Sequence, residues 1–157
     1  MERSLVSVLV VDDFIPFRSF ICSTLATRVN LLVSGEASDG LEAVHKTKEL
    51  QPDLILLDIG LPTLDGMSAA REICKLSKSK IIFVTQESGA DFVQEALALG
   101  AWGYVMKARA STDLLAAVDA VCDGQKFVSD GFGQKLTVSK FDSEKQLSCR
   151  RRLDPFP

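Results

Sequence analysis

Five short apolar runs, most of them rich in β-branched residues, are the feature that most limits how this chain can fold. Each run is too continuously apolar for a strand with one face in water, so we expect strands buried on both faces of a parallel sheet. The five predicted strands are Val6–Val11, Leu31–Val33, Leu54–Leu57, Ile81–Val84 and Gly103–Met106.

Between and after these runs, apolar residues recur three or four positions apart, which predicts five amphipathic helices. Pro16 suits the first turn of the first helix, and Asp39 with Glu42 resembles a capping box. Gly100 and Gly124 suit helix ends. The positions expected to face the core are Phe17, Ile21 and Leu25; Leu41, Val44 and Lys48; Ala69, Ile73 and Leu76; Val93, Ala96 and Leu97; and Leu114, Val118, Val121 and Cys122.

Alternation of strands and helices predicts the fold class. Neighbouring parallel strands need a crossover connection, and right-handed crossovers through helices cover both faces of the sheet. We therefore predict an α/β fold with a doubly wound, five-stranded parallel sheet in a three-layer sandwich.

Length and composition limit the remaining possibilities. The 157 residues suffice for one core, and 46% hydrophobic with 25% charged residues is ordinary for a globular protein. A net charge of −3 offers no basic surface for nucleic acid. No run approaches the roughly 18 apolar residues of a membrane span, and the N-terminal run lacks a cleavage site, so we expect a cytoplasmic protein.

Two further features suggest no additional chemistry. The four cysteines, at positions 22, 74, 122 and 149, form no C-x-x-C pair, which favours reduced thiols over a zinc or redox site. From Phe132 onward the periodicity fades. We expect one folded domain over residues 1–129, followed by a tail or truncated linker over 130–157.

Polar residues fall where the predicted strands end. Asp12 and Asp13 end the first strand, Asp58 the third and Thr85 the fourth, while Lys107 follows the fifth. Ligands of open α/β sheets bind beyond the carboxyl ends of the strands, so these five side chains are aimed at one edge.

The three carboxylates would repel one another there unless a cation lay between them. Carboxylate oxygens suit Mg²⁺, and one carboxylate could then attack phosphorus to give an aspartyl phosphate. Asp58 is the candidate acceptor, with Asp12 and Asp13 left to hold the ion. Lys107 and the Thr85 hydroxyl would contact phosphoryl oxygens.

At this point the sequence resembles the response-regulator receiver family of two-component systems. The segments that resemble family motifs are VLVVDD with its acidic pair, LILLDIGLPTLDG with Pro62 and Gly66, IIFVTQE with Thr85, and GAWGYVMK with Tyr104 and Lys107. The resemblance covers roughly residues 5–128. It implies a flavodoxin-like sheet with strand order 2-1-3-4-5.

The resemblance also implies a chemistry. Asp58 would be phosphorylated by a histidine kinase, and Mg²⁺ would be bound by Asp13, Asp58 and the backbone carbonyl of Gly60, with Asp12 assisting. Such a chain is a signalling domain whose catalysis is limited to its own phosphoryl transfer and dephosphorylation.

A conformational switch is implied as well. In the family, the threonine at the Thr85 position and the aromatic residue at the Tyr104 position respond to the phosphate and remodel the face of the fourth helix, fifth strand and fifth helix. We expect a phosphorylation-dependent homodimer through that face. Gly60 and Glu87 flank the site in the family and influence the lifetime of the phosphoryl group.

The segment GAWGYVMKARASTDLLAAVDAVCDGQKFVSD further resembles the NarL/FixJ subgroup, whose receivers precede a LuxR-type helix-turn-helix. This implies a role in controlling transcription. Residues 130–157 are too few for a DNA-binding module, so we expect no direct nucleic-acid binding by this segment.

Two alternatives stay open. An interaction module that never becomes phosphorylated could share the same site residues. A nucleotide or flavin binder, or a Mg²⁺-dependent phosphatase-like enzyme, could share the fold. The loop DDFIPFRSF lacks the glycines of a cofactor loop, and its adjacent aspartates differ from an Asp-x-Asp nucleophile pair.

Overall fold

The computed structural model describes residues 4–130 of the chain. Strands and helices alternate through this part, and a short 3-10 helix, η1 (Lys107–Arg109), precedes the last α-helix. The strands are β1 (Val6–Val11), β2 (Leu31–Ala37), β3 (Leu54–Leu57), β4 (Lys80–Thr85), β5 (Gly103–Met106) and β6 (Phe127–Val128). The helices are α1 (Ile15–Leu25), α2 (Gly40–Leu50), α3 (Gly66–Leu76), α4 (Ala90–Ala98) and α5 (Ala110–Cys122).

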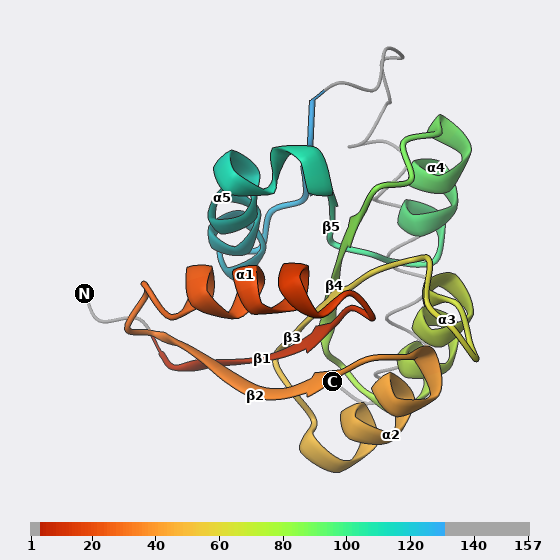
Figure 1. The fold of residues 1–157 in the computed structure, drawn as a ribbon, viewed down its shortest axis with the longest axis horizontal. Coiled ribbons are helices and arrows are strands. Elements are labelled where there is room, and N and C mark those ends of the chain that lie inside the picture. The colour runs from red at the N-terminus through yellow and green to blue at the C-terminus, as the bar shows by residue number, and fades with distance from the viewer. Residues whose placement is uncertain (1–3, 131–157) are drawn as a thin grey trace.

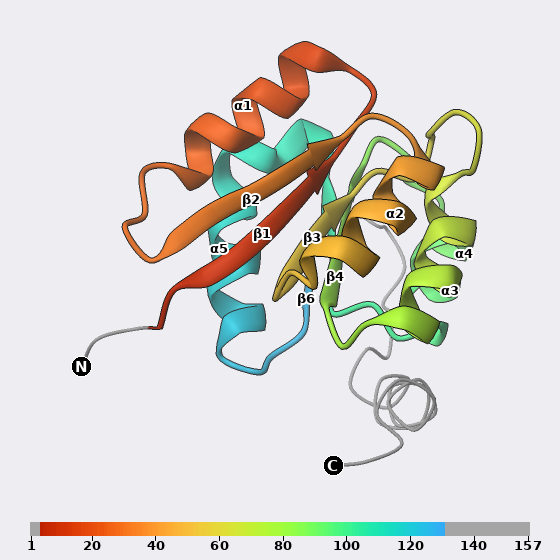
Figure 2. The same cartoon turned by 90° about the horizontal axis from the view of Figure 1, so that it is seen from below.

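All strands pair in parallel, in the order β2-β1-β3-β4-β5-β6. The helices α1 and α5 cover one face of the sheet, and α2, α3 and α4 cover the other (Figures 1 and 2). The predicted three-layer α/β fold and the strand order 2-1-3-4-5 are therefore confirmed. No helix within residues 4–130 has both the length and the apolar character needed to cross a membrane.

The core consists of two layers because successive strand residues point to opposite faces. Leu9 and Val11 of β1 join the layer under α2, α3 and α4, whereas Val8 and Val10 join the layer under α1 and α5. All four side chains are at most 1% exposed. Burial on both faces explains why the runs of β1, β3 and β4 are continuously apolar. The same prediction is wrong for β2, which lies at the edge of the sheet and leaves Leu32 49% exposed.

The sheet has one strand more than predicted. Phe127 and Val128 of β6 pair with Gly103 and Tyr104 of β5. The next residue extends the contact, because the Ser129 amide donates to the Tyr104 carbonyl at 2.9 Å. A strand of two residues has no periodicity that sequence patterns could reveal.

The predicted cap of α2 is confirmed; of its predicted core positions, Val44 packs against the core, but Leu41 and Lys48 are exposed. Asp39 accepts from the Glu42 amide at 2.7 Å, whereas Leu41 is 51% exposed. The buried positions are Gly40, Ala43 and Thr47. A side chain at Gly40 would place its Cβ 1.8 Å from the Leu64 carbonyl oxygen, so the close approach at the start of α2 requires glycine.

Two other predicted core positions lie at helix ends and are also not buried. Leu76, the last residue of α3, is 39% exposed, and Cys122, the last residue of α5, is exposed. The apolar spacing continues through these residues, but it does not show which side of the last turn faces the core: in α5 the neighbouring Val121 is buried instead.

Candidate functional site

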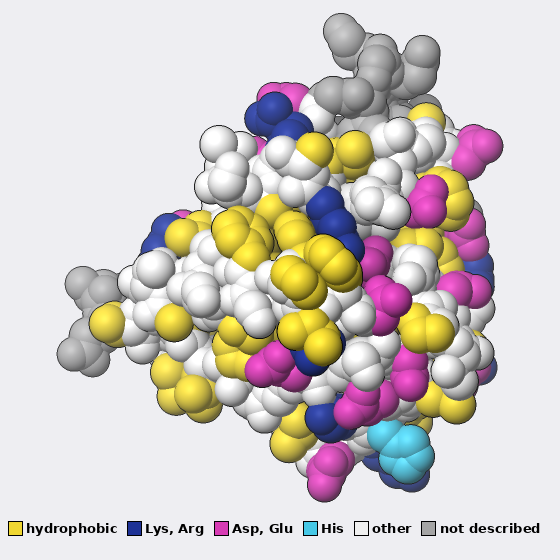
Figure 3. Space-filling view, viewed as in Figure 1, with side chains coloured by type: hydrophobic (Ala, Val, Ile, Leu, Met, Phe, Trp, Pro, Cys, Tyr) yellow, Lys and Arg dark blue, Asp and Glu magenta, His cyan; other side chains and the backbone are white. Residues whose placement is uncertain are grey.

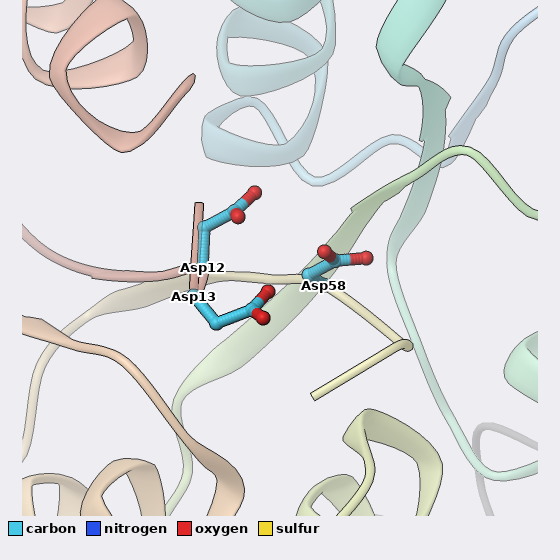
Figure 4. Close-up of side chains that lie close together, drawn as sticks. All are labelled: Asp12, Asp13 and Asp58. Atoms are coloured by element: carbon cyan, nitrogen blue, oxygen red, sulfur yellow. The ribbon is translucent and has the colours of Figure 1, made fainter. Parts of the chain in front are cut away.

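The carboxyl ends of the central strands bring together the acidic residues that the sequence analysis singled out. Asp12 and Asp13 directly follow β1, and Asp58 directly follows the neighbouring β3. Each of the three offers a carboxylate oxygen, and these oxygens all lie within 4.8 Å of one another (Figure 4). Asp12 and Asp58 are buried, while Asp13 is exposed. One side of the cluster therefore opens to solvent.

Asp58 has a different set of partners on each carboxylate oxygen. Its Oδ1 accepts from the amides of Ile59 at 2.7 Å and Gly60 at 3.4 Å, and its Oδ2 accepts from Lys107 Nζ at 3.0 Å. The start of α3 packs directly behind, since a Cβ at Gly66 would lie 2.0 Å from the Asp58 carbonyl oxygen. The loop after β3 thus holds the side chain in one orientation.

Asp12 is the most deeply buried carboxylate of the cluster, and one of its oxygens has incomplete hydrogen bonding. It has no exposed surface, and its Oδ1 accepts from the Phe14 amide at 2.8 Å. Its Oδ2 lies 2.8 Å from Lys107 Nζ but makes no hydrogen bond of acceptable geometry within residues 4–130. Burial raises the pKa of Asp12 above its usual 3.8, and the partially compensating contacts with Lys107 and Phe14 do not offset it. The cluster therefore holds more negative charge than its partners neutralise.

Lys107 begins η1, immediately after β5, and reaches both buried carboxylates. Burial alone would lower the pKa of Lys107, but the contacts with Asp12 and Asp58 outweigh burial and raise it. The same ammonium lies 4.7 Å from the centre of the Phe17 ring. Lys107 is thus a fixed cation beside the acidic cluster.

Thr85 and Tyr104, on the adjacent strands β4 and β5, lie next to the cluster and are fully buried. Both contact the backbone of Glu87: the Thr85 hydroxyl accepts from its amide at 3.2 Å, and the Tyr104 hydroxyl donates to its carbonyl at 2.7 Å. Burial raises the pKa of Tyr104, and the charges of Glu87 and Asp58 add to this effect. One loop therefore links the two side chains.

A hollow of about 730 Å³ opens onto the cluster. Gly60 lies at its edge, and a Cβ there would meet nothing within 4 Å, so this position leaves room beside Asp58. The residues that line the hollow are Asp13, Phe14, Phe17, Asp58, Gly60, Thr85, Gln86, Glu87, Lys107 and Ala108.

All the residues predicted from strand ends meet at this one edge. Sequence reasoning missed the aromatic side of the hollow, which Phe14 and Phe17 form. The periodicity of the first helix predicted Phe17 as a core residue, and it does pack against the layer under α1 and α5. Nothing in that pattern indicated that its ring also covers Lys107.

Comparison with known proteins identifies the family to which this arrangement of strand-end residues belongs. Residues 8–119 match the family model described as "Response regulator receiver domain". The chain is 32% identical over 141 residues to the response regulator GacA of Pseudomonas viridiflava, covering 89% of this chain and 66% of GacA. It is 33% identical over 145 residues to the transcriptional regulatory protein LiaR of Bacillus subtilis, covering 91% of this chain and 69% of LiaR. About a third of each relative has no counterpart here.

The fold agrees with a solved relative. A crystal structure of a two-component response regulator of the LuxR family, from Aurantimonas sp. SI85-9A1, superposes with a TM-score of 0.77. The two are 27% identical, and the match covers 92% of this chain and 99% of that one. Taken with the family match over residues 8–119, this means that the chain belongs to the response regulator receiver family and is a signalling domain of a two-component system.

Proposed function

We propose that this receiver accepts a phosphoryl group on Asp58 from a histidine kinase, in a reaction that depends on Mg²⁺. The observation that supports this most strongly is the arrangement of the Asp58 carboxylate. One oxygen is held by two backbone amides and the other by Lys107, and the side chain lines an open hollow. A carboxylate fixed in this way is oriented for attack on phosphorus.

The donor set fits a hard divalent cation. Three carboxylates offer oxygens within 4.8 Å of one another, and the buried Oδ2 of Asp12 has no hydrogen bond from any described residue. We propose that Asp13, Asp58 and the carbonyl of Gly60 hold Mg²⁺, with Asp12 assisting. When bound, the ion would neutralise the excess negative charge and that of the incoming phosphoryl oxygens.

The remaining roles belong to side chains of the site. An oxygen of Asp58 forms the new bond to phosphorus as the phosphorus–nitrogen bond of the kinase phosphohistidine breaks, and the imidazole takes a proton from solvent. Lys107 moves from the carboxylate to a phosphoryl oxygen, and the Thr85 hydroxyl donates to another. Water that enters beside Gly60 later hydrolyses the acyl phosphate and returns Asp58 to a carboxylate.

The output follows from the same residues. Thr85 and Tyr104 both contact the Glu87 backbone, so movement of Thr85 toward the phosphate changes the surroundings of Tyr104. We propose that this remodels the face of α4, β5 and α5, favours a symmetric homodimer and thereby controls transcription. A partner on this face would also meet β6, which pairs with β5. Sedimentation with and without a phosphoryl mimic tests the dimer, and an unchanged monomer would contradict it.

The extent of the domain is also a proposal. Ser129 is 3% exposed, its amide donates to the Tyr104 carbonyl, and its hydroxyl accepts from the Met106 amide at 3.1 Å. These contacts support residue 129 as the end of the receiver. The tail proposed for residues 130–157 lies outside the described residues, except for Asp130.

Intact mass after incubation with Mg²⁺ and acetyl phosphate tests the chemistry. We expect wild type to gain one phosphoryl group, Asp58→Asn to gain none, and chelation of Mg²⁺ to abolish the gain. Asp53→Asn is a matched control, because Asp53 lies just before β3, at the amino ends of the strands and away from the acidic cluster. This variant should behave as wild type. A gain in Asp58→Asn would exclude Asp58 as the acceptor, and no gain in any sample would favour an unphosphorylated interaction module.

A further inference from the structure

The Lys107 ammonium is held from three sides, and one of these is aromatic. Nζ lies 2.8 Å from Asp12 Oδ2, 3.0 Å from Asp58 Oδ2 and 4.7 Å from the centre of the Phe17 ring. A cation at this distance over an aromatic face is attracted by the ring quadrupole. The ring also limits access of water, and the Lys107 side chain is only 18% exposed.

The Phe17 ring is itself held in place. It is partly buried and packs against the core layer under α1 and α5. The more exposed Phe20 ring lies beside it, with centroids 5.5 Å apart. Its backbone is tied to the acidic cluster, because the Phe17 amide donates to the Phe14 carbonyl and the Phe14 amide donates to Asp12. One face of the ring is thus fixed by the core while the other is turned toward Lys107 and the hollow.

The three contacts of Lys107 respond differently to cation binding and to phosphorylation of Asp58. Both carboxylates take part in the proposed reaction, so their charge and partners change when a cation binds and when Asp58 is esterified. The Phe17 ring has no charge or proton to exchange. Its attraction for the ammonium is therefore the contact that persists through every stage of the reaction.

We infer that Phe17 is a positioning residue, which keeps the Lys107 ammonium beside Asp58 and within reach of the incoming phosphoryl group while the carboxylates change state. The inference rests on the proposed phosphorylation of Asp58. Loss of the ring would leave the flexible lysine stem free to follow Asp12 alone, away from the incoming phosphoryl group. Figure 3 shows hydrophobic side chains gathered over the start of α1. In this part of the chain Phe14 and Ile15 are exposed, whereas Phe17 is partly buried.

The test compares Phe17→Leu, which keeps an apolar side chain but removes the aromatic face, with Phe17→Tyr, which keeps both. Phe20→Leu is the matched control, because it removes the neighbouring, 37% exposed ring but leaves the packing of Phe17 against the core in place. With acetyl phosphate and Mg²⁺, we expect Phe17→Leu to phosphorylate about two- to fivefold more slowly, the range for an aromatic contact with a cation. Phe17→Tyr and Phe20→Leu should match wild type.

A spectroscopic measurement separates positioning from a general loss of structure. The ring should shift the Lys107 ε-methylene NMR resonances upfield, and these are assigned by their absence in Lys107→Arg. We expect the shift to vanish in Phe17→Leu and to persist in Phe17→Tyr and Phe20→Leu. Should Phe17→Leu fail to fold, Phe17→Met provides a second aliphatic substitution.

Each outcome decides between the claims. An unchanged Lys107 resonance in Phe17→Leu would overturn the contact, and a lost shift with an unchanged rate would overturn the positioning role. A rate that falls equally in Phe17→Leu and Phe20→Leu would also overturn it. If wild type itself took up no phosphoryl group, the proposed function would fail and the positioning role with it, whereas the resonance shift would still report the contact.

Discussion

Two buried aspartates, Asp12 in the acidic cluster and Asp113 on α5, have very different surroundings. Asp12 has no exposed surface, and within residues 4–130 one of its oxygens has no hydrogen bond. Asp113 is 8% exposed and accepts from Ser129 at 2.6 Å, Arg109 at 3.0 Å and Thr112 at 3.2 Å. Burial pushes both pKa values up, but only at Asp113 do the hydrogen bonds outweigh it and lower the pKa below 3.8.

The contrast separates a structural carboxylate from one that is held ready for chemistry. Two of the three hydrogen bonds of Asp113 join α5 to residues outside it, Arg109 of η1 and Ser129 after β6. The Ser129 hydroxyl also accepts from the Met106 amide of β5. Around Asp12 the charges are left incompletely compensated, at the same edge as the acceptor Asp58. Buried polar groups with incomplete partners are concentrated at functional sites. A bound cation would compensate the negative charge of Asp12.

The largest effect is expected at Asp113. Asp113→Asn removes the charge that strengthens the hydrogen bonds from Ser129 and Arg109, so the free energy of unfolding should fall by about 2 kcal/mol. Urea unfolding at neutral pH measures it. Asp119→Asn is the control on the same helix: its pair with Arg28 is 37% exposed on each side, so water and salt screen it and its loss should cost much less. Equal losses in the two variants would contradict a special role for the Asp113 network.

The Asp113 network also shows where sequence reasoning reached its limit. Asp12, Asp58 and Lys107 could be predicted to meet, because parallel strands bring their carboxyl ends to one edge. Asp113 and Ser129 come together only because β6 returns along β5, and two residues leave no pattern to read. The bond between them joins positions 16 residues apart.

Helix periodicity also predicted some buried positions correctly and others wrongly. It predicted the buried faces of α1 and α4, where Ile21, Leu25 and Val93 are at most 1% exposed. In α2 it was right at Val44 but wrong at Leu41, because the helix buries Gly40, Ala43 and Thr47, with Gly40 against the Leu64 backbone. Apolar spacing reports burial in general, but not which element lies opposite, and this is also why the contact between Phe17 and Lys107 was missed.

At Asp12 the same substitution should act in the opposite direction. Asp12→Asn removes a buried charge whose burial is not fully offset, so without divalent cations the free energy of unfolding should rise by about 1 kcal/mol. Unfolding in the presence of a chelator measures this. Added Mg²⁺ should stabilise wild type more than Asp12→Asn, because a ligand of the folded state stabilises by mass action. A loss of stability in Asp12→Asn would show that its contact with Lys107 outweighs burial.

The smallest effect is a difference in pH window between the two aspartates. The folded pKa of Asp113 lies below the unfolded value near 3.8, so its contribution is fully present above that pH. The contribution is lost as pH falls through the lowered folded pKa, and the deficit of Asp113→Asn should shrink there. The folded pKa of Asp12 lies above 3.8, so the wild-type penalty is present at higher pH and disappears as pH falls through the raised pKa toward 3.8.

Unfolding free energies of wild type and both variants, measured across the acid range with a chelator present, resolve these windows. The gain of Asp12→Asn should disappear first on acidification, while the deficit of Asp113→Asn is still intact. Differences between each variant and wild type cancel the titration of the other carboxyl groups, provided that those groups are unaffected by the substitution. If both effects were lost over the same pH range, the two carboxylates would titrate alike. The incompletely compensated charge of Asp12 would then not be what distinguishes the carboxyl ends of the strands.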